Sequence, residues 1–283
     1  MSYYYRQVQL GPGAPGPFLR SIIIINIAVF LASLLIGNYI FHGGHFFGWL
    51  YSHFGMTPSF FLRYLHLWQP VTYMFIHSHT GILHIFFNML MLWMFGTEIE
   101  QRMGSRRFGI FYFFCGAGAG ILSYLFSFVC VAAGMKEAWQ VPTVGASGAI
   151  YGVMMAFALF FPNRLILLFF IIPIRAFYLM MGLGLMQLYY LVSMPYGGIS
   201  YIAHVSGMLL AFLFLKYQWP VAGFVEGIAE QRREEKTRQE KTRAEEDQKR
   251  IDCILDKINT GGMHTLTKEE KNFLRERSRR RRR

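Results

Sequence analysis

Long runs of apolar residues, separated by short polar stretches, dominate the first 217 positions of this chain. A helix that crosses a membrane needs about 20 mostly apolar residues. Six segments fit this requirement and are predicted to be membrane-spanning helices: 21–41, 82–103, 108–133, 147–161, 176–192 and 199–217. The pattern therefore predicts an all-α polytopic membrane protein with six helices.

Three connections between these helices have a distinctive composition. The segment 43–80 is rich in aromatic residues, which collect where membrane meets water, so it is predicted to lie partly embedded in the outer leaflet. The segment 164–175 is apolar, contains Pro173 and has an arginine at each end, which favours an interfacial segment leading into the fifth helix. The sequence 194–198, with its proline and two glycines, predicts a tight loop.

The charged residues divide the chain into two unlike parts. Of 28 basic and 16 acidic residues, 18 and 13 lie after Val225, which leaves 10 and 3 before it. So few charges cannot cover a surface that faces water, so lipid is the expected solvent of the first part. The predicted organisation is a cytoplasmic N-terminal segment 1–20, a membrane domain 21–217 and a charged cytoplasmic tail 218–283. The net charge of +12 fits a cytoplasmic excess of basic residues, and no nucleic-acid partner is predicted.

Basic residues also predict the orientation of the membrane domain. With a cytoplasmic N-terminus, only Arg63 and Lys136 fall on the outer side, against eight basic residues on the inner side. This excess is the one expected of cytoplasmic loops. Both termini are then cytoplasmic, and the start of the fourth helix at 145–148 opens toward the outer face. The eight inner basic residues are Arg6, Arg20, Arg102, Arg106, Arg107, Arg164, Arg175 and Lys216.

The charged tail has its own pattern. Opposite charges at three- and four-residue spacing predict a helix over 226–250. An apolar stripe over 251–258 predicts a second helix, which the glycines at 261–262 end, and 267–270 is a capping box for a third. Such a tail is predicted to be solvated or to bind lipid headgroups, with a partner or regulatory surface as the alternative.

The histidines require a metal site to be considered. His77, His79 and His84 form a His-x-His-x4-His pattern, and three histidines can bind zinc. Other histidines occur nearby at 42, 45, 53 and 66. However, no His-Glu-x-x-His motif occurs and no acidic residue precedes Gly96, so a hydrolytic zinc site would lack a carboxylate base. The three cysteines have no Cys-x-x-Cys spacing, and no metal or other cofactor is predicted.

Polar side chains inside three of the predicted spans are candidate site residues, because they are costly to bury in lipid. The second span contains His84 and Asn88, the fourth begins with Ser147, and the sixth contains His204. Each has an ordinary structural alternative: a serine can cap a helix or pack closely, and a lone histidine is more often a packed, hydrogen-bonded residue. Taken singly, these residues favour structure over catalysis.

Small residues indicate that the fourth and sixth spans lie against each other. Gly148 and Gly152 share one face of the fourth span, and Gly207 and Ala211 share one face of the sixth. Helices with such faces can approach closely. The serine hydroxyl at 147 would then lie within hydrogen-bond reach of the imidazole at 204, as an activated serine requires.

The polar pair in the second span suits a different role. His84 and Asn88 are four residues apart and therefore lie on one helical face. Two hydrogen-bond donors aimed at one point can stabilise the oxyanion of a tetrahedral intermediate. The structural alternative is a hydrogen bond between helices.

In combination, the motifs resemble those of the rhomboid intramembrane serine proteases, over roughly 21–217. Each motif is weak alone, but their order and their positions on the spans are specific. They are His-x-x-x-Asn (84–88), Gly-Thr-Glu-Ile-Glu-Gln-Arg-Met-Gly (96–104), Gly-x-Ser-Gly (145–148) and Ala-His-x-x-Gly-x-x-x-Ala (203–211). The resemblance implies a six-helix rhomboid-like bundle. The tail is similar to a helical appendage of some bacterial rhomboids, which implies a bacterial inner membrane.

The resemblance also implies roles for single residues. Ser147 and His204 would form a dyad without an aspartate, and Tyr151 would stack on His204 and orient it. The oxyanion would be held by the backbone N–H at 147 with the side chains of His84 and Asn88. A structural polar pair is implied at 100 and 102, and a lateral gate in the fifth helix and the outer loop. The implied substrates are transmembrane segments of single-span proteins, and the other expected partner is the lipid bilayer.

Two departures from the family pattern leave residue roles open. His79 has the family's spacing to His84, whereas His77 has its Phe-x-His pattern, so the sequence does not choose between them. Where the family often has Trp-Arg, this chain has Trp68-Gln69. Two other functions compete: a non-catalytic rhomboid-like binder of transmembrane clients, and a small channel or transporter, which the absence of internal repeats disfavours. The sequence carries no signal for an oligomeric state.

Overall fold

The structure of the chain, a computed structural model, describes residues 12–41, 44–168, 171–193, 198–217, 248, 250–259, 261–262, 266–269 and 272. The chain divides into two compact units, Met1–Trp219 and Pro220–Arg283. Each unit is described by itself.

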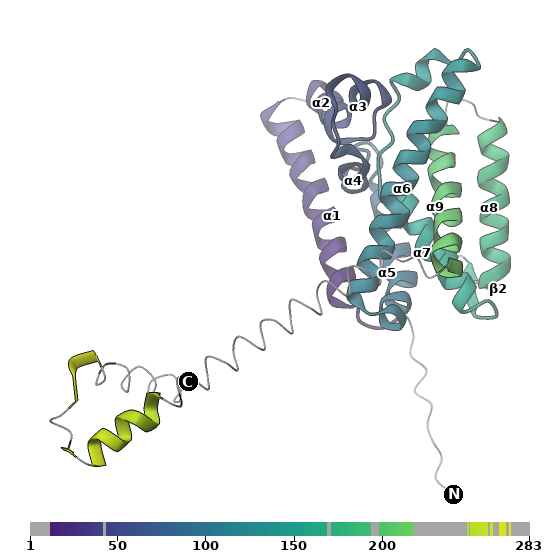
Figure 1. The fold of residues 1–283 in the computed structure, drawn as a ribbon. Helices are drawn as coiled ribbons and strands as arrows, with labels where there is room; N and C mark the ends of the chain where they lie inside the picture. Colours follow the sequence, from purple (N-terminus) through teal and green to yellow (C-terminus); the bar gives the residue numbers. More distant parts are fainter. Residues whose placement is uncertain are drawn as a thin grey trace, which may run out of the picture. The chain divides into compact units, whose positions relative to one another are not determined.

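Six long helices make up most of the described part of the first unit and run up and down beside one another (Figure 1). Their ends agree with the six predicted spans to within four residues when the π-helical turn that continues the first helix to Ile40 is included, which confirms the all-α polytopic fold. Four of them, α1, α5, α6 and α8, are long and apolar enough to cross a membrane, and α7 and α9 contribute shorter apolar helices. The six are α1 (Pro17–Leu35, continued by the π-helical turn η1, Ile36–Ile40), α5 (Ile82–Met103), α6 (Ser105–Ala132), α7 (Ser147–Phe160), α8 (Ala176–Ser193) and α9 (Gly198–Tyr217).

Helix α7 lies at the centre and packs against α5, α6, α8 and α9. Nine of its 14 residues are buried, and five of these nine are glycine or alanine, which lets the neighbouring backbones come close. The helix ends at Phe160, just before Pro162. A proline disfavours helical geometry at the residue before it, so this end is encoded locally.

The aromatic connection between α1 and α5 folds into short helices. Of these, α2 and α3 lie beside α1 at one end of the bundle (Figure 1). Trp49, Tyr64 and Trp68 remain about half exposed, as expected for side chains that face a membrane boundary. The short elements are α2 (Gly44–Phe54), α3 (Pro58–Tyr64), α4 (Gln69–Thr72), η2 (Tyr73–Phe75) and, between α6 and α7, η3 (Lys136–Trp139).

The Trp68-Gln69 pair ties this connection together. The buried Gln69 amide donates to the backbone oxygen of Ser52 (2.7 Å) and accepts from the N–H of Thr57 (3.3 Å). The indole of Trp68 donates to the backbone oxygen of His53 (2.8 Å). The Gln69 amide therefore holds the loop by hydrogen bonds to its backbone.

The segment predicted only as interfacial is a two-stranded antiparallel hairpin, β1 (Leu165–Leu168) with β2 (Ile172–Arg175). It lies at the end of the bundle opposite α2 and α3 (Figure 1). Pro173 fits because each strand of a two-stranded sheet is an edge strand, where a missing N–H is tolerated. The prediction gave no strand here, since a short apolar run has no period that separates strand from helix.

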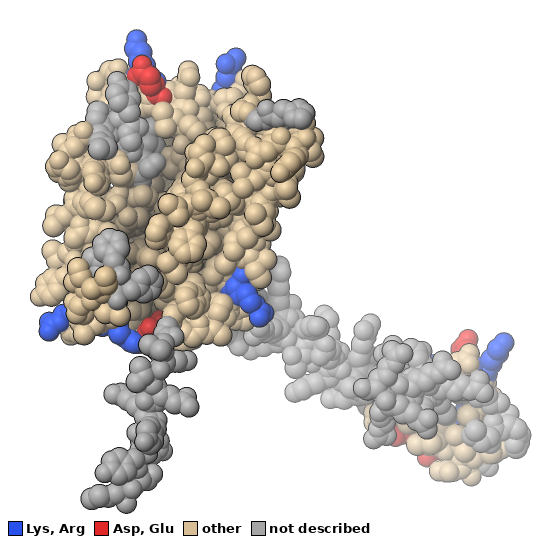
Figure 2. Space-filling model, turned by 180° about the vertical axis from the view of Figure 1, so that it is seen from behind, with Lys and Arg blue, Asp and Glu red and all other residues tan. Residues whose placement is uncertain are grey.

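Charged side chains mark the two ends of the first unit. Figure 2 shows them at the top and bottom of one face, with an uncharged band between. Glu100 is buried at one such end, where its carboxylate accepts from the N–H groups of Phe18 and Leu19 at the start of α1 (both 3.0 Å). Helix starts lack intrahelical acceptors for these groups and favour negative charge.

The polar pair implied at Glu100 and Arg102 is not a pair in the structure. The guanidinium of Arg102 lies over the ring of Phe160, 4.5 Å from its centroid, while Glu100 binds the start of α1. Residues two apart on a helix point in different directions, which explains the separate partners.

In the second unit, residues 250–259 are helical, as the apolar stripe predicts. Ile254 and Leu266 are buried within this unit. Gly262 has φ +80° and donates to the backbone oxygen of Ile258 (2.8 Å), which ends the helix as expected. The predicted helix over 226–250 lies almost entirely outside the described residues. The predicted capping box lies partly outside them, because Glu270 is not described.

Candidate active site

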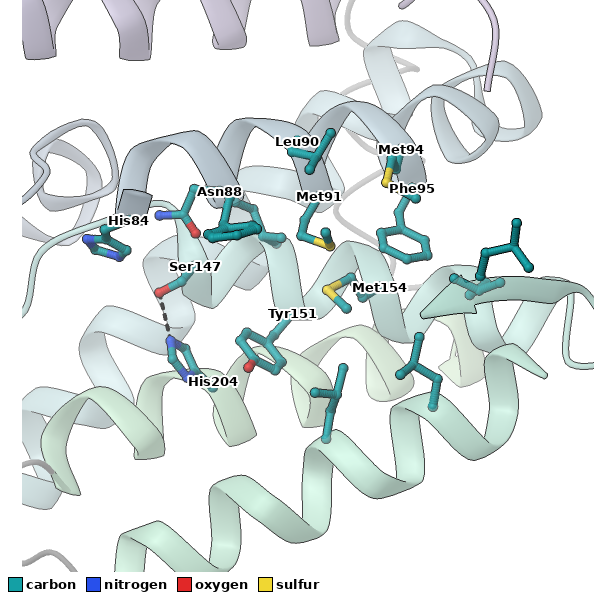
Figure 3. Close-up of a pocket in the computed structure, with 16 residues that line it drawn as sticks. His84, Asn88, Leu90, Met91, Met94, Phe95, Ser147, Tyr151, Met154 and His204 are labelled. Atoms are coloured by element: carbon teal, nitrogen blue, oxygen red, sulfur yellow. Dashed lines mark hydrogen bonds between the residues drawn. The ribbon is translucent and has the colours of Figure 1, made fainter. Parts of the chain in front are cut away.

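Helices α5, α7, α8 and α9 surround a cavity of about 430 Å³ (Figure 3). Most of its lining is apolar. Its polar lining residues are the five predicted site residues: His84, Asn88, Ser147, Tyr151 and His204. In Figure 3, Ser147 lies between His204 on one side and His84 and Asn88 on the other.

Ser147 and His204 are hydrogen-bonded, with 2.8 Å between the serine Oγ and the histidine Nε2 (Figure 3). Close contact between α7 and α9 makes this possible. A Cβ added at Gly207 would overlap the backbone oxygen of Gly148, and one added at Gly152 would lie 3.1 Å from the backbone oxygen of Gly207. The predicted close approach of these two helices is confirmed.

Tyr151 stacks on the other side of the histidine. Its ring centroid lies 4.3 Å from that of His204, with 18° between the ring planes. Tyr151 follows Ser147 by four residues, so one face of α7 carries both side chains. The imidazole is therefore held against α7 by its face as well as by its Nε2 edge.

Gln187 on α8 is a contact of the histidine that the sequence prediction omitted. It is buried, its Oε1 lies 2.9 Å from Nδ1 of His204, and its Nε2 donates to the hydroxyl of Tyr151 (2.8 Å). A carbonyl oxygen only accepts, so Nδ1 of the histidine carries the proton and Nε2 turns its lone pair to Ser147. A signal was present in the sequence: an amide in the middle of an apolar span, the same criterion that selected Asn88.

His84 and Asn88 converge on the loop just before Ser147. A Cβ placed on Gly145 would lie 3.1 Å from Cε1 of His84 and 3.6 Å from Nδ2 of Asn88. Gly145 also has φ +115°, a conformation that favours glycine, so both space and backbone geometry restrict this position. The buried Nδ2 of Asn88 makes no hydrogen bond to any other residue that the structure describes, which leaves this donor free for a ligand.

The backbone around Ser147 is fixed and positively polarised. Ser147 is the first residue of α7, where N–H groups lack intrahelical acceptors and the helix dipole is positive. The loop before it is held by the Gly145 N–H, which donates to the backbone oxygen of Tyr73 (2.9 Å). A two-residue bridge between Met56 and Thr143 ties the same loop to the α2–α3 connection.

The structure separates the two histidines whose roles the sequence left open. His77 is buried with its ring centroid 5.4 Å from that of His84, and burial, with the nearby His84, lowers the pKa of His77 to about 4. His79 turns away, with its Nδ1 hydrogen-bonded to the hydroxyl of Tyr51 (2.7 Å) and its ring stacked on Phe47. The Phe-x-His pattern, rather than the spacing, identifies the histidine beside the site.

The described residues include no cluster of three or more histidine, cysteine or acidic side chains placed to hold a metal ion. The expectation that the chain uses no metal or cofactor stays a prediction.

Comparison with known proteins gives matches for both parts of the chain. Residues 64–220, more than half of the chain, match the family described as Rhomboid domain, and residues 232–280 match a family of unknown function (DUF6576). Rhomboid protein 1, mitochondrial, of Saccharomyces cerevisiae is 28% identical over 164 residues, which is 55% of this chain and 42% of that protein. Rhomboid protease GlpG of Yersinia enterocolitica is 25% identical over 202 residues, 70% of this chain and 61% of that protein.

A third relative, Rhomboid protease GluP of Bacillus subtilis, is 34% identical over 103 residues, 36% of this chain and 18% of that protein. The aligned parts therefore cover less than two thirds of the length of each of these three relatives. The relatives come from mitochondria as well as from bacteria.

Proposed function

This chain is a member of the rhomboid family and an integral membrane protein, and on that premise we propose that it is an intramembrane serine endopeptidase. Its proposed substrates are the transmembrane segments of single-span membrane proteins. One observation carries the proposal: the Ser147 hydroxyl lies 2.8 Å from Nε2 of His204, while Nδ1 of the same ring is hydrogen-bonded to Gln187. This is the arrangement in which a serine becomes a nucleophile.

The first half of the reaction follows from the positions of the polar groups. Ser147 Oγ attacks the carbonyl carbon of the scissile peptide bond while Nε2 of His204 takes the hydroxyl proton. The oxygen that becomes negative is held by N–H groups of His84 and Asn88 and by the backbone N–H at Ser147. The free, buried donor of Asn88 supports this assignment, because a ligand oxygen would give it a partner.

The second half returns the protons. His204 gives its Nε2 proton to the leaving amine as the carbon–nitrogen bond breaks, which leaves an acyl ester on Ser147. A water molecule then attacks the ester carbon, and His204 takes a proton from it and returns that proton to Ser147 Oγ. The products are the two peptide fragments, and the enzyme is regenerated.

The apolar part of the cavity suits an apolar side chain of the substrate. It is lined by flexible and aromatic residues from α5 and α7, including Met91, Phe95 and Met154, and by Leu179 and Leu183 of α8. Methionine adapts to side chains of different shape. We place substrate entry between α5 and α8, since both helices line the cavity and α8 is mostly exposed.

Location and orientation are part of the proposal. The basic residues support cytoplasmic termini and a site that opens to the outer face. A bacterial inner membrane remains the predicted location, although the relatives include both mitochondrial and bacterial proteins.

The test is cleavage by purified protein reconstituted in lipid with a generic transmembrane substrate. We expect Ser147→Ala and His204→Ala to abolish cleavage, and Ser147→Ala to abolish labelling by a serine-directed fluorophosphonate. Ser127→Ala is the matched control, because the Ser127 hydroxyl is buried in α6 and, among the described residues, donates only to the backbone oxygen of Tyr124. Retained cleavage by Ser147→Ala would refute the mechanism. Wild-type protein that binds substrates but neither cleaves nor labels would favour the non-catalytic binder instead.

A further inference from the structure

Helix α8 presents an unusual residue to the protein interior. Only three of its 18 residues are buried: Ala176, Met180 and Gln187. Many of its other large side chains are exposed, with exposed fractions as high as 66% for Tyr189 and 83% for Val192. An amide buried at membrane depth is costly unless both of its groups are hydrogen-bonded, so a leucine would be the simpler choice at 187.

Both groups of the Gln187 amide are used, and both contact the proposed catalytic residues. The carbonyl oxygen accepts from Nδ1 of His204, and the amide nitrogen donates to the Tyr151 hydroxyl. The imidazole is thereby held on three sides, by Ser147 at one edge, by Gln187 at the other and by the Tyr151 ring on its face. A flip of the ring about its Cβ–Cγ bond would break both hydrogen bonds.

We propose that Gln187 is a positioning residue for the proposed proteolytic reaction, and that it makes the active orientation of His204 depend on the position of α8. The first half of the proposal concerns the proton. His204 can take a proton at Nε2 only if its own proton sits on Nδ1, and the Gln187 carbonyl selects that arrangement. The same carbonyl accepts from Nδ1 after the ring becomes an imidazolium, when both nitrogens carry protons.

No charged group takes this role among the residues described around the histidine. The titratable side chains that face His204 are His84 from α5 and Tyr151 from α7, and the cavity lining includes no carboxylate. An amide orients the imidazole without adding a charge to an apolar interior, where an unpaired carboxylate would be costly. Gln187 therefore contacts the same histidine nitrogen, Nδ1, that the aspartate contacts in the Ser-His-Asp triad of soluble serine proteases.

The second half of the proposal concerns α8. Ser147, Tyr151 and His204 belong to the packed pair α7 and α9, whereas Gln187 belongs to a helix that is buried at only three positions. If α8 moves outward to admit a substrate, both Gln187 hydrogen bonds break. His204 then loses the partner that selects its protonated nitrogen. Cleavage is thus expected only after α8 has returned to the position in which Gln187 is hydrogen-bonded to His204 and Tyr151.

Two substitutions test this role in the reconstituted full-length protein. Gln187→Leu removes both hydrogen bonds at similar volume, and we expect kcat to fall about 10- to 100-fold, less than the roughly 10⁴-fold loss when a triad carboxylate is replaced. KM should change little, and fluorophosphonate labelling of Ser147 should slow in parallel. Gln187→Glu keeps an acceptor for Nδ1, so it should recover most of the lost rate. Its negative charge stabilises the imidazolium, which moves the acid limb of the pH–rate profile to higher pH.

Met180→Ala is the matched control, because Met180 is buried on the same helix and makes no polar contact among the described residues. It should lower thermal stability without moving the acid limb. Wild-type kcat in Gln187→Leu would overturn the proposal. So would equal losses in Gln187→Leu and Gln187→Glu with an unmoved acid limb, since that result marks a packing role alone. If instead wild-type protein neither cleaves nor labels, it is the proposed function that fails.

Discussion

Helices α7 and α8 have similarly apolar sequences, and both contact the imidazole of His204, yet they are built in opposite ways. Nine of 14 residues are buried in α7, against three of 18 in α8. One helix is apolar because protein surrounds it, and the other because lipid is expected to surround it. The proposed site therefore combines a fixed part on α7 and α9 with a part on a helix of low contact density, which is the kind of element that moves.

Glycine shows the difference most directly. At Gly207 on α9 a Cβ would overlap the backbone of α7, whereas at Gly182 on α8 no atom beyond the helix's own nearby backbone lies within 4 Å of the Cβ position. The same residue type thus permits close backbone packing in one helix and has no packing role in the other. The hydropathy of the sequence does not distinguish the packed glycine from the unpacked one, because both lie in apolar runs.

The largest effect predicted for this comparison of helices uses these two glycines as a matched pair. Gly207→Ala should push α7 and α9 apart and lengthen the Ser147–His204 contact, and a displacement of about 1 Å can cost about 10²-fold in rate. Gly182→Ala should retain wild-type cleavage and gain up to about 1 kcal/mol from helix propensity. The measurements are kcat/KM with a transmembrane substrate and the thermal midpoint in detergent. Equal losses in both variants would remove the contrast between the helices.

The sequence predicts most of this architecture because membrane helices are encoded by length and hydropathy. The start of α7 at Ser147 and both ends of α5 were predicted at the correct residue. The β1–β2 hairpin was not, since its strands of four residues are too short to show a period. Which side chains line a cavity depends on packing, so the sequence could place Ser147 and His204 in neighbouring helices only through their small-residue faces.

Two parts of the candidate site needed the structure. Gln187 was omitted although it is the only amide in its span, because none of the motifs that carry the family resemblance lies in α8. The choice between His77 and His79 depends on how the chain turns before α5, and that turn is fixed by contacts with Tyr51 and Phe47, some 28 to 32 positions earlier. A local pattern carries no information about partners at such separations.

An intermediate effect is predicted at Tyr151, where α7 meets α8. Tyr151→Phe keeps the ring on His204 but loses the hydrogen bond from Gln187, so kcat should fall about 3- to 10-fold, the worth of one hydrogen bond. Tyr151→Leu also loses the stacked ring, which is worth about 1 kcal/mol more, and should fall further. Single-turnover cleavage rates distinguish the two.

The same tyrosine tests whether the two helices act together. On a Gln187→Leu background, Tyr151→Phe should cost little more, because the hydrogen bond it removes is already gone. Losses that simply multiply would show that the Tyr151 hydroxyl and the Gln187 amide act independently. The double variant therefore measures the link between the packed and the exposed helix apart from the effect of either residue alone.

The smallest predicted effect comes from a pair of valine substitutions, which test packing without changing a glycine or a polar group. Val153 on α7 is fully buried, and Val192 on α8 is 83% exposed, so Val→Ala removes the same two methyl groups from two environments. In a membrane, moving apolar surface from lipid into protein gives no hydrophobic gain. What the Val153 substitution loses is therefore the dispersion contact of the two methyl groups with neighbouring protein. Val153→Ala should lower the free energy of unfolding by about 1–2 kcal/mol, whereas Val192→Ala should leave it unchanged. Unfolding followed in mixed micelles measures both. A loss at Val192 equal to that at Val153 would mean that α8 is packed against protein on the face that is exposed here, and an α8 covered in that way could not move aside to admit a substrate.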